Sequence, residues 1–301
     1  MAIGRIGHGR SGLRRQSLVW MGLAALLSAA AVLSACGGGG HKTAAPAKPR
    51  DARFDRANFG RPATGASPWL PLKPGTQWVR EGTTIVGRRK VPHQVTTTVT
   101  DVYRVIDGVK TVAVFDYDFD AGQVEQESLD YMAEDKDGNL WYLGGYTEEY
   151  EGGRFIAAVD AWLSGVRGAR YGLVVPARPR VPSPEYALAA PDGEERDVAK
   201  VVKVGARRCV RFKCFDDVLI VREGKESDPD NELKYYARDV GQIDNVPQSA
   251  SHHKDFEQLV NLTQLSPKAL AEASAEALRL DRNAIKHARR TFGRFPPAKR
   301  G

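Results

Sequence analysis

Four glycines at nearly regular intervals constrain the fold of this chain more than any other feature of its sequence. Gly108, Gly122, Gly138 and Gly153 stand 14, 16 and 15 residues apart, and apolar and polar residues alternate between them. Alternating runs separated by Asp-Gly or Gly-Gly are strong hairpin signals. The intervals leave strands of about 11 or 12 residues, roughly 40 Å at 3.3 Å per residue. Long antiparallel neighbours must twist, so we predict a mainly β fold in which a long antiparallel meander forms a curved sheet or open barrel.

The strand pattern resumes after an excursion over residues 162–184 and ends near residue 262, where a helical pattern replaces it. Ser266-Pro267 places a capping residue before a proline, and apolar residues then recur at helical spacing up to Leu280. We predict a β domain over 69–262 and a basic helical tail over 263–301. Two interpretations of the tail stay open: it lies on anionic lipid headgroups, or it is a solvated helix with a frayed end.

The N-terminus has the pattern of an export signal. Residues 1–17 carry four arginines and no acid, and residues 18–35 carry no charge. The apolar run ends in Leu-Ser-Ala-Cys at 33–36, which resembles the lipobox of bacterial lipoproteins. This resemblance implies a lipoprotein signal peptide over 1–35, cleavage before Cys36, and attachment of diacylglycerol and palmitate to that cysteine. The alternative is an uncleaved membrane anchor, since about 18 apolar residues can just span a bilayer.

The segment after the expected lipidation site is predicted to be a tether. Residues 36–68 are rich in Gly, Pro, Ala and charge, and such a composition does not offset the entropy lost on ordering. We therefore expect a membrane-anchored, extracytoplasmic protein. It would lie on the outer membrane of a diderm bacterium, or on the outer face of the plasma membrane of a monoderm.

The positive charge of the chain is confined to its flanks. The whole sequence has a formal net charge of +7, but residues 62–265 carry −7, whereas 37–61 carry +4 and 266–301 carry +6. An acidic body has no basic face for a phosphate backbone, so we expect no nucleic-acid partner. The expected partner is the membrane, reached through the lipid anchor, and protein partners stay unknown.

One set of acidic residues is a candidate cation site. Aspartates alternate with aromatic residues on one predicted strand, and two glutamates share a face of the next. Across the intervening turn their oxygens can converge on a hard cation. We favour the alternative, a solvated outward face, since alternating charge is typical of one. The set consists of Asp116, Asp118, Asp120, Glu125 and Glu127.

The remaining chemistry in the sequence is sparse. Cys209 and Cys214 are the only cysteines besides Cys36, and outside the cytoplasm they can form a disulfide across a short hairpin. The chain has no Gly-x-Ser-x-Gly elbow, His-Glu-x-x-His, Walker or Rossmann motif. We therefore assign no catalytic residue, no cofactor and no metal.

Five segments stand out in order along residues 70–265: Leu-Lys-Pro-Gly-Thr-Gln-Trp-Val at 72–79, Asp-Lys-Asp-Gly-Asn-Leu-Trp-Tyr at 135–142, Thr-Glu-Glu-Tyr-Glu at 147–151, Val-Pro-Ala-Arg-Pro at 175–179 and Lys-Tyr-Tyr-Ala at 234–237. Together they resemble an uncharacterised family of exported bacterial proteins, many of them lipoproteins. The family has no established activity, so the resemblance implies no catalytic residues. Arg238-Asp239 departs from the Pro-Gly that is usual in the family after Tyr-Tyr-Ala.

Two classes of function stay open. The first is a non-enzymatic binding or assembly module that holds a lipid or other hydrophobic ligand on the concave face of the sheet, and the second is an envelope hydrolase without a recognisable motif. A deep apolar cavity with few titratable groups would favour binding, whereas converging carboxylates or histidines with displaced pKa values would favour catalysis. A purely structural protein would have a filled interior.

Overall fold

The computed structural model describes residues 53–60, 66–191, 196–227, 231–248 and 255–301. These residues belong to one compact unit, Arg50–Gly301. The expected signal peptide and Cys36 lie outside the described residues.

In the described part of the chain, 14 strands form one antiparallel sheet. Ten of the strands have seven or more residues, and the others are short. The strands are β1 (Thr76–Val86), β2 (Arg89–Ile106), β3 (Val109–Asp120), β4 (Gln123–Glu134), β5 (Leu140–Glu151), β6 (Arg154–Leu163), β7 (Gly172–Val175), β8 (Tyr186–Ala189), β9 (Asp197–Cys209), β10 (Cys214–Glu223), β11 (Glu232–Ala237), β12 (Gly241–Pro247), β13 (Phe256–Gln264) and β14 (Lys299–Arg300).

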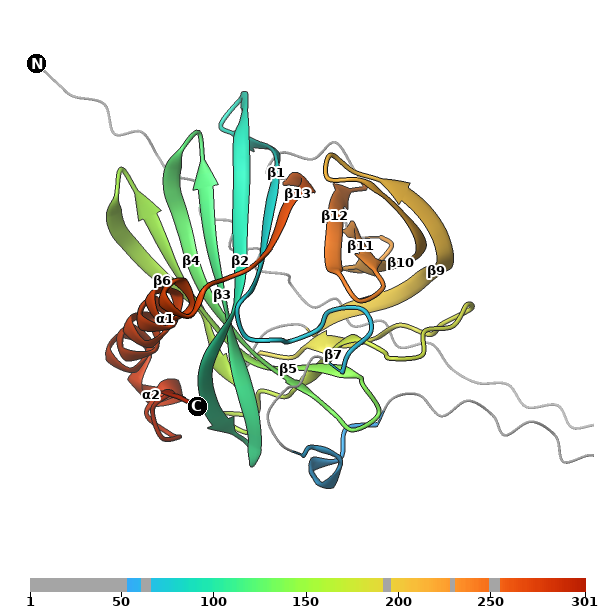
Figure 1. Cartoon of the computed structure of the whole chain (residues 1–301). Helices are drawn as coiled ribbons and strands as arrows, with labels where there is room; N and C mark the ends of the chain where they lie inside the picture. Colours follow the sequence, from blue (N-terminus) through green and yellow to red (C-terminus); the bar gives the residue numbers. More distant parts are fainter. Residues whose placement is uncertain (1–52, 61–65, 192–195, 228–230, 249–254) are drawn as a thin grey trace, which may run out of the picture. The chain divides into compact units, whose positions relative to one another are not determined.

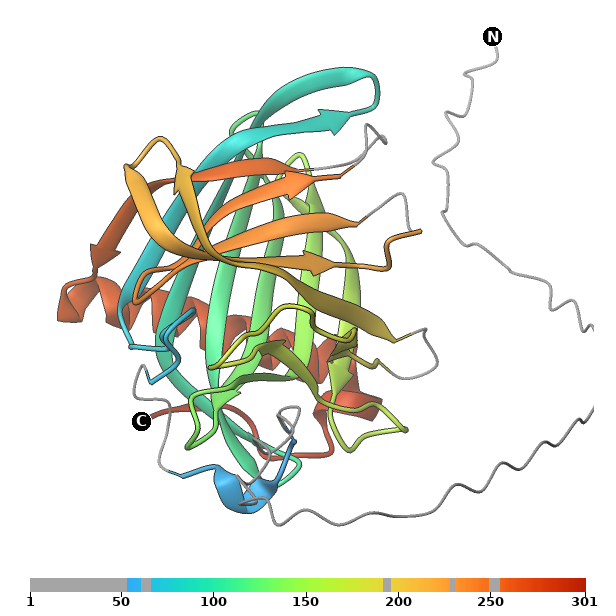
Figure 2. The same cartoon turned by 90° about the vertical axis from the view of Figure 1, so that its right-hand side faces the viewer.

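The sheet curls without closing, which confirms the predicted fold class. Its strand order is β6-β5-β4-β3-β2-β1-β13-β12-β11-β10-β9-β8, while β7 pairs with β5 and β14 pairs with β2. The strands β1–β6 form one side and β9–β12 the other, so that the two sides face each other across a common interior (Figures 1 and 2). An isolated bridge between Arg170 and Ala190 joins the segments beside β7 and β8 at one end of the curl.

The hairpin turns lie where the glycine spacing predicts them. All four turn glycines adopt φ values between 74° and 85°, which side chains with a Cβ rarely adopt. Each lies between two consecutive strands of the series β2 to β6. A register shift between Val99 and Tyr103 interrupts the pairing of β2 with β3. Turn chemistry and alternation therefore determine the register of the meander.

The convex face of β2–β6 is covered by the C-terminal helices α1 (Pro267–His287) and α2 (Arg289–Phe292). Ser266 caps α1, since its hydroxyl accepts a hydrogen bond from the Ala269 N–H at 3.3 Å. Ala277, Leu280 and Ala284 form the buried side of the helix. Figure 1 shows α1 against the outer side of the sheet. The predicted tail is therefore part of the body, with one face packed and the other exposed.

A buried polar cluster fixes α1 to the sheet. The Arg104 guanidinium on β2 donates to the Asp281 carboxylate on α1 and, at 2.6 Å, to the Phe292 carbonyl. The Tyr131 hydroxyl donates to Asp281 Oδ1 at 2.6 Å, and the Ala298 N–H donates to Asp281 Oδ2 at 3.1 Å. One buried carboxylate thus joins two strands, the helix and the C-terminal segment.

The segment before β1 differs from a flexible tether in the part that the structure describes. Phe54 stacks on Tyr171 with ring centroids 3.5 Å apart, and Arg56 pairs with Asp107 at 2.6 Å. Further along, Trp69 is fully buried in the interior. Aromatic side chains in an otherwise polar segment supply the apolar contacts that hold it against the sheet.

Candidate functional site

A cavity of about 280 Å³ lies on the concave side of the sheet. Residues from β1 to β5 line one wall, and residues from β8, β10 and β11 contribute to the opposite wall. An apolar cavity of about 150 Å³ is already large enough to bind benzene, so this space accommodates a small organic molecule. The interior is therefore not completely filled by side chains.

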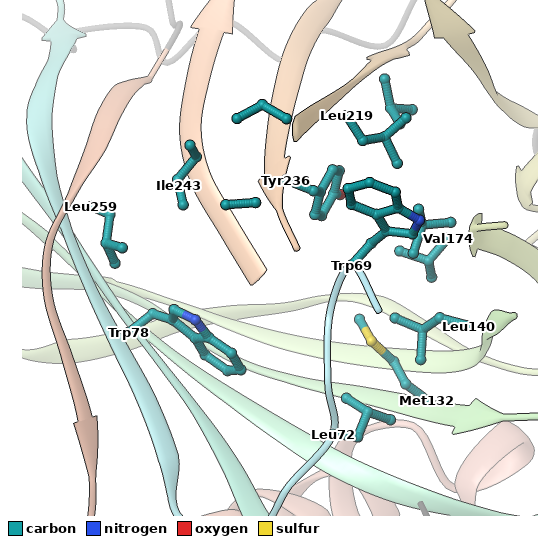
Figure 3. Close-up of a cluster of buried hydrophobic side chains, with 14 of the residues drawn as sticks. Trp69, Leu72, Trp78, Met132, Leu140, Val174, Leu219, Tyr236, Ile243 and Leu259 are labelled. Atoms are coloured by element: carbon teal, nitrogen blue, oxygen red, sulfur yellow. The ribbon is translucent and has the colours of Figure 1, made fainter. Parts of the chain in front are cut away.

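One part of the cavity is apolar. Leu72 precedes β1, Met132 lies on β4 and Val174 on β7, and all three side chains line it. Trp78 and Tyr236 contribute aromatic surface from β1 and β11. Figure 3 shows these residues within the buried cluster between the two sides of the sheet. The indole N–H of Trp78 donates to the Val240 carbonyl at 2.7 Å, which fixes the ring against the wall.

The other part is strongly acidic. Among the described lining residues, seven are Asp or Glu, two are Arg or Lys and one is His. The alternation of strands brings these side chains to one face, since residues two apart on a strand point the same way. The cavity thus has an apolar part and a charged part, and so combines the apolar lining that would favour binding with the titratable groups that would favour catalysis.

The two basic side chains that line the cavity, Arg80 and Lys234, already form ion pairs with acidic residues. Arg80 on β1 binds Glu257 on β13 through its Nε at 2.9 Å, and both side chains are buried. Lys234 on β11 contacts Glu223 at 2.7 Å and Glu232 at 3.3 Å. Burial opposes the charge on Lys234, but the two carboxylates outweigh it and raise the pKa of the lysine. Both cations are therefore held in the charged state by their own acidic partners.

A histidine and its carboxylates form a second polar group on this wall. His93 Nδ1 lies 2.8 Å from Asp120 Oδ1, and His93 Nε2 lies 3.8 Å from Asp255 Oδ2. Asp120 also shares a hydrogen bond with Glu125, which, together with burial, raises the pKa of Glu125 to about 8. Glu125 therefore keeps its proton at neutral pH.

Three further carboxyls of the cavity have no ion-pair partner among the described residues. Asp116 Oδ1 and Asp118 Oδ1 are buried without a hydrogen-bond partner. Burial raises the pKa of Asp116 against the opposing effect of Arg80, and burial with the charge of Asp116 raises the pKa of Asp118 further. Asp130 accepts a hydrogen bond from the Tyr142 hydroxyl at 2.7 Å, and burial raises its pKa to about 7.

The aspartates point inward, whereas we favoured an outward, solvated face. The alternation itself is as expected, because Asp116 and Asp118 share one face of β3 and Phe115 and Tyr117 share the other. It is the aromatic face that lies on the convex side, where Phe115 packs in the cluster beneath α1. The helix needs an apolar surface to cover, so the polar residues of β3 are left for the interior.

The predicted cation site does not assemble as a whole. Glu127 lies opposite Tyr117 on β3 and so belongs to the convex face. There it binds Arg279 of α1 at 2.6 Å and accepts a hydrogen bond from the Tyr150 hydroxyl at 2.7 Å. Among the described residues, no group of three or more His, Cys, Asp or Glu side chains has the geometry to hold a metal ion.

Two other sequence features have structural roles. Cys209 and Cys214 form a disulfide across the hairpin between β9 and β10. Asp135 belongs to the turn between β4 and β5, where its carboxylate accepts from the Asn139 amide and, at 2.9 Å, from the Trp141 indole. Neither feature contributes to the cavity.

Sequence reasoning missed the paired cations and His93. A period of two places Arg80 on the same face as Trp78, and Lys234 on the same face as Tyr236. A cation that shares a strand face with a core aromatic residue is a signal of an inward charge. The partner of Arg80 is not visible locally, because Glu257 stands 177 residues further along the chain.

Comparisons with known proteins give little. No family model matches the sequence, and no curated protein matches it. A solved structure described as "a putative lipoprotein from Parabacteroides distasonis ATCC 8503" aligns with 65% of this chain and 99% of its own, at 10% identity and a TM-score of 0.31. At that TM-score it supports no functional argument. Among the helices that the structure describes, none has the length and apolar character needed to cross a bilayer.

Proposed function

We propose that this protein is a lipid-anchored protein of the cell envelope that binds a small amphipathic molecule in its concave cavity. The observation that carries the proposal is the cavity of about 280 Å³ with an apolar part beside a charged part. Ligand sites typically combine an apolar lining with a few convergent polar groups, and this cavity fits that description. A wholly hydrophobic ligand is less suitable, because the acidic wall would lose its solvent without gaining a partner.

Native mass spectrometry of protein purified from its own membrane tests the binding proposal. We expect a small molecule to co-purify with the wild-type chain and to be lost in Val95→Phe, because Val95 is buried at the cavity wall. The matched control is Val204→Phe, the same change at a position on β9 that is 38% exposed. A cavity that is always empty, or a ligand retained equally by both variants, would contradict the proposal.

The anchor is tested separately. We expect radiolabelled palmitate to enter the wild-type protein, and Cys36→Ala to lose both the label and the membrane association. Two acyl chains or more are needed for stable attachment, so removal of the modified cysteine has a large effect. An unlabelled protein that stays on the membrane in the Cys36→Ala variant would contradict lipid anchoring.

A second candidate function is acid–base catalysis in the same cavity. The observation that favours it is the row of Asp116, Asp118 and Asp130 on one wall of the cavity, whose pKa values are all raised. The co-purified molecule provides the test when it is returned to the purified protein and its mass is followed. Conversion by the wild type that is lost in Asp130→Asn would establish catalysis, whereas a ligand recovered unchanged would contradict it.

A further inference from the structure

We propose that the molecule bound in the cavity carries a cationic group, an ammonium or guanidinium on an apolar body, which lies at Asp116, midway along the acidic row from Asp118 to Asp130. This inference rests on the proposed binding function and names the class of its ligand. Three independent properties of the cavity support it: its charge balance, its unpartnered oxygens and the position of its apolar part.

The ion pairs of the wall leave carboxyls without a cation at one place. Arg80 is matched by Glu257, and Lys234 is matched by Glu223 and Glu232. His93 is in contact with Asp120. After these pairs, the carboxyls that remain on β3 and β4 have no cation within ion-pair distance in the described part of the chain. A positive group of a ligand is the partner that this surface lacks.

Unpartnered oxygens indicate where that group sits. Asp116 Oδ1 and Asp118 Oδ1 face the cavity, are shielded from solvent and accept no hydrogen bond. A buried polar atom without a partner costs about 1–3 kcal/mol, and more when it is charged. Such a cost is rarely retained in a native protein unless a ligand, ion or water relieves it. Ammonium and guanidinium groups, which only donate, complement acceptors of this kind.

The spacing and surroundings of the carboxyls suit an organic cation. Asp116 and Asp118 share a face of β3, so their Cα atoms are about 6.6 Å apart at 3.3 Å per residue. Asp130 on β4 is paired with Val114, the neighbour of Asp116 on the same face of β3. Asp118 therefore lies roughly 13 Å along the strands from Asp130, so a single ammonium or guanidinium group at Asp116 can reach that carboxyl and one of its two neighbours. The apolar lining around Met132 then receives the rest of the molecule.

Proton release accompanies binding in this arrangement. Burial favours the neutral form of the three carboxyls, whereas an approaching cation favours the ionised form. Binding of the cation therefore expels protons, and its affinity increases as the pH rises toward the pKa of about 7 at Asp130. The charged and titratable groups that surround the three carboxyls are Arg80, Glu257, Lys234, Asp160, Asp255 and Tyr142.

Three probes with the same chain and different charge test the inference: hexylammonium, hexanol and hexanoate. The full lipidated protein is placed in phosphatidylcholine nanodiscs, and empty nanodiscs provide the reference for partition into lipid. Ligand-detected NMR then gives the three affinities. We expect hexylammonium to bind at least about tenfold more tightly than hexanol, and hexanoate to bind most weakly. Calorimetry in two buffers of different ionisation enthalpy is expected to show net proton release with hexylammonium only.

Matched variants locate the effect. The double variant Asp116→Asn/Asp118→Asn keeps the shape of both side chains, and we expect it to lose the preference for hexylammonium while it retains hexanol. Asp216→Asn, a change at a side chain that is 76% exposed on β10, is expected to change nothing. The wild-type probe series and the proton release test the inference even if the double variant does not fold.

The outcomes separate this inference from the proposed function. Equal binding of hexylammonium and hexanol would overturn the cationic ligand and leave the binding function intact. Failure of all three probes, together with the absence of a co-purified molecule, would remove the binding function itself. Displacement of hexylammonium by submillimolar calcium chloride alone would show an inorganic cation site and would overturn the organic ligand.

Discussion

At the scale of single residues, Asp130 is a buried carboxyl that also lines the proposed binding cavity. It lies at the cavity wall and accepts a hydrogen bond from Tyr142, and burial raises its pKa to about 7. Its neighbour Asp116 adds to this effect through its negative charge. The folded chain therefore binds a proton at mildly acidic pH that the unfolded chain, with an Asp pKa of about 3.9, has already released.

This difference predicts a pH-dependent stability. The native state binds more protons than the unfolded state between about pH 4 and 7, so the free energy of unfolding contributed by Asp130 falls as the pH rises through that range. Asparagine imitates the neutral acid and still accepts from Tyr142. We expect the free energy of unfolding of Asp130→Asn, relative to that of the wild type, to increase by about 2 kcal/mol from pH 5 to pH 8. Urea unfolding at the two pH values measures this difference. Asp216→Asn serves as the exposed control. A stability difference between Asp130→Asn and the wild type that is the same at pH 5 and at pH 8 would contradict the prediction.

Local sequence determines which residues of a strand share a face, but it does not determine which face is inside. The alternation of Phe115, Asp116, Tyr117 and Asp118 correctly separates aromatic from acidic side chains. The assignment of the acids to solvent was wrong, because it assumed that the apolar side of β3 faces the concave interior. A helix more than 140 residues further along the chain covers that side instead.

At the scale of elements, α1 is held by one apolar stripe and one buried polar cluster. Leu280 is fully buried on the convex face, between strands and helix. Arg282, two residues on, is exposed. The helical spacing in the sequence predicts the element and its cap, whereas the contact with β2 depends on residues such as Arg104 that lie 177 positions away from their partner.

Truncation of the apolar stripe has a predictable cost. We expect Leu280→Ala to lower the free energy of unfolding by about 2–5 kcal/mol, because a fully buried leucine leaves a cavity between helix and sheet. Arg282→Ala on the exposed side of the same helix is expected to change it by less than about 0.5 kcal/mol. Urea unfolding measures both, and similar small effects of the two changes would show that α1 is not packed as described.

The buried polar cluster gives a separate prediction. Arg104→Met leaves the Asp281 carboxylate buried without its cation, and we expect a loss of about 3–5 kcal/mol. In the double variant Arg104→Met/Asp281→Leu no charge is left behind, so we expect most of the loss to be recovered. Thermal or urea unfolding of the two variants gives the comparison. A double variant less stable than the single one would mean that the cluster contributes net stability beyond the removal of a buried charge.

At the scale of the whole molecule, the curled sheet is weakly paired at the junction of β12 and β13, which we call the seam. β12 and β13 share two paired positions, whereas β13 and β1 share eight. The tip of the hairpin between β9 and β10 spans this region, since the Phe212 N–H donates to the Leu259 carbonyl of β13 at 3.0 Å and Arg211 pairs with Glu81 of β1. The disulfide between Cys209 and Cys214 lies at the base of this tip.

Removal of the disulfide is expected to loosen the seam. In Cys209→Ser/Cys214→Ser, we expect faster hydrogen exchange at the Phe212 amide and through β13, and a loss of at most about 2 kcal/mol in the free energy of unfolding. Exchange at the meander β2–β5 should stay unchanged, which provides the internal control. Equal acceleration in both regions would mean that the hairpin tip does not fasten the seam.

The two-sided burial of β3 has an evolutionary consequence. Many sheet strands have one side in solvent, where substitutions accumulate at little cost. On β3, one side carries the carboxyls of the cavity and the other carries aromatic residues that pack beneath α1. Most substitutions in β3 would therefore disturb either ligand recognition or packing against α1. In a library that replaces every position in turn, this strand should therefore tolerate few alternatives, and the substitutions that it accepts should sort by residue parity into two distinct phenotypes.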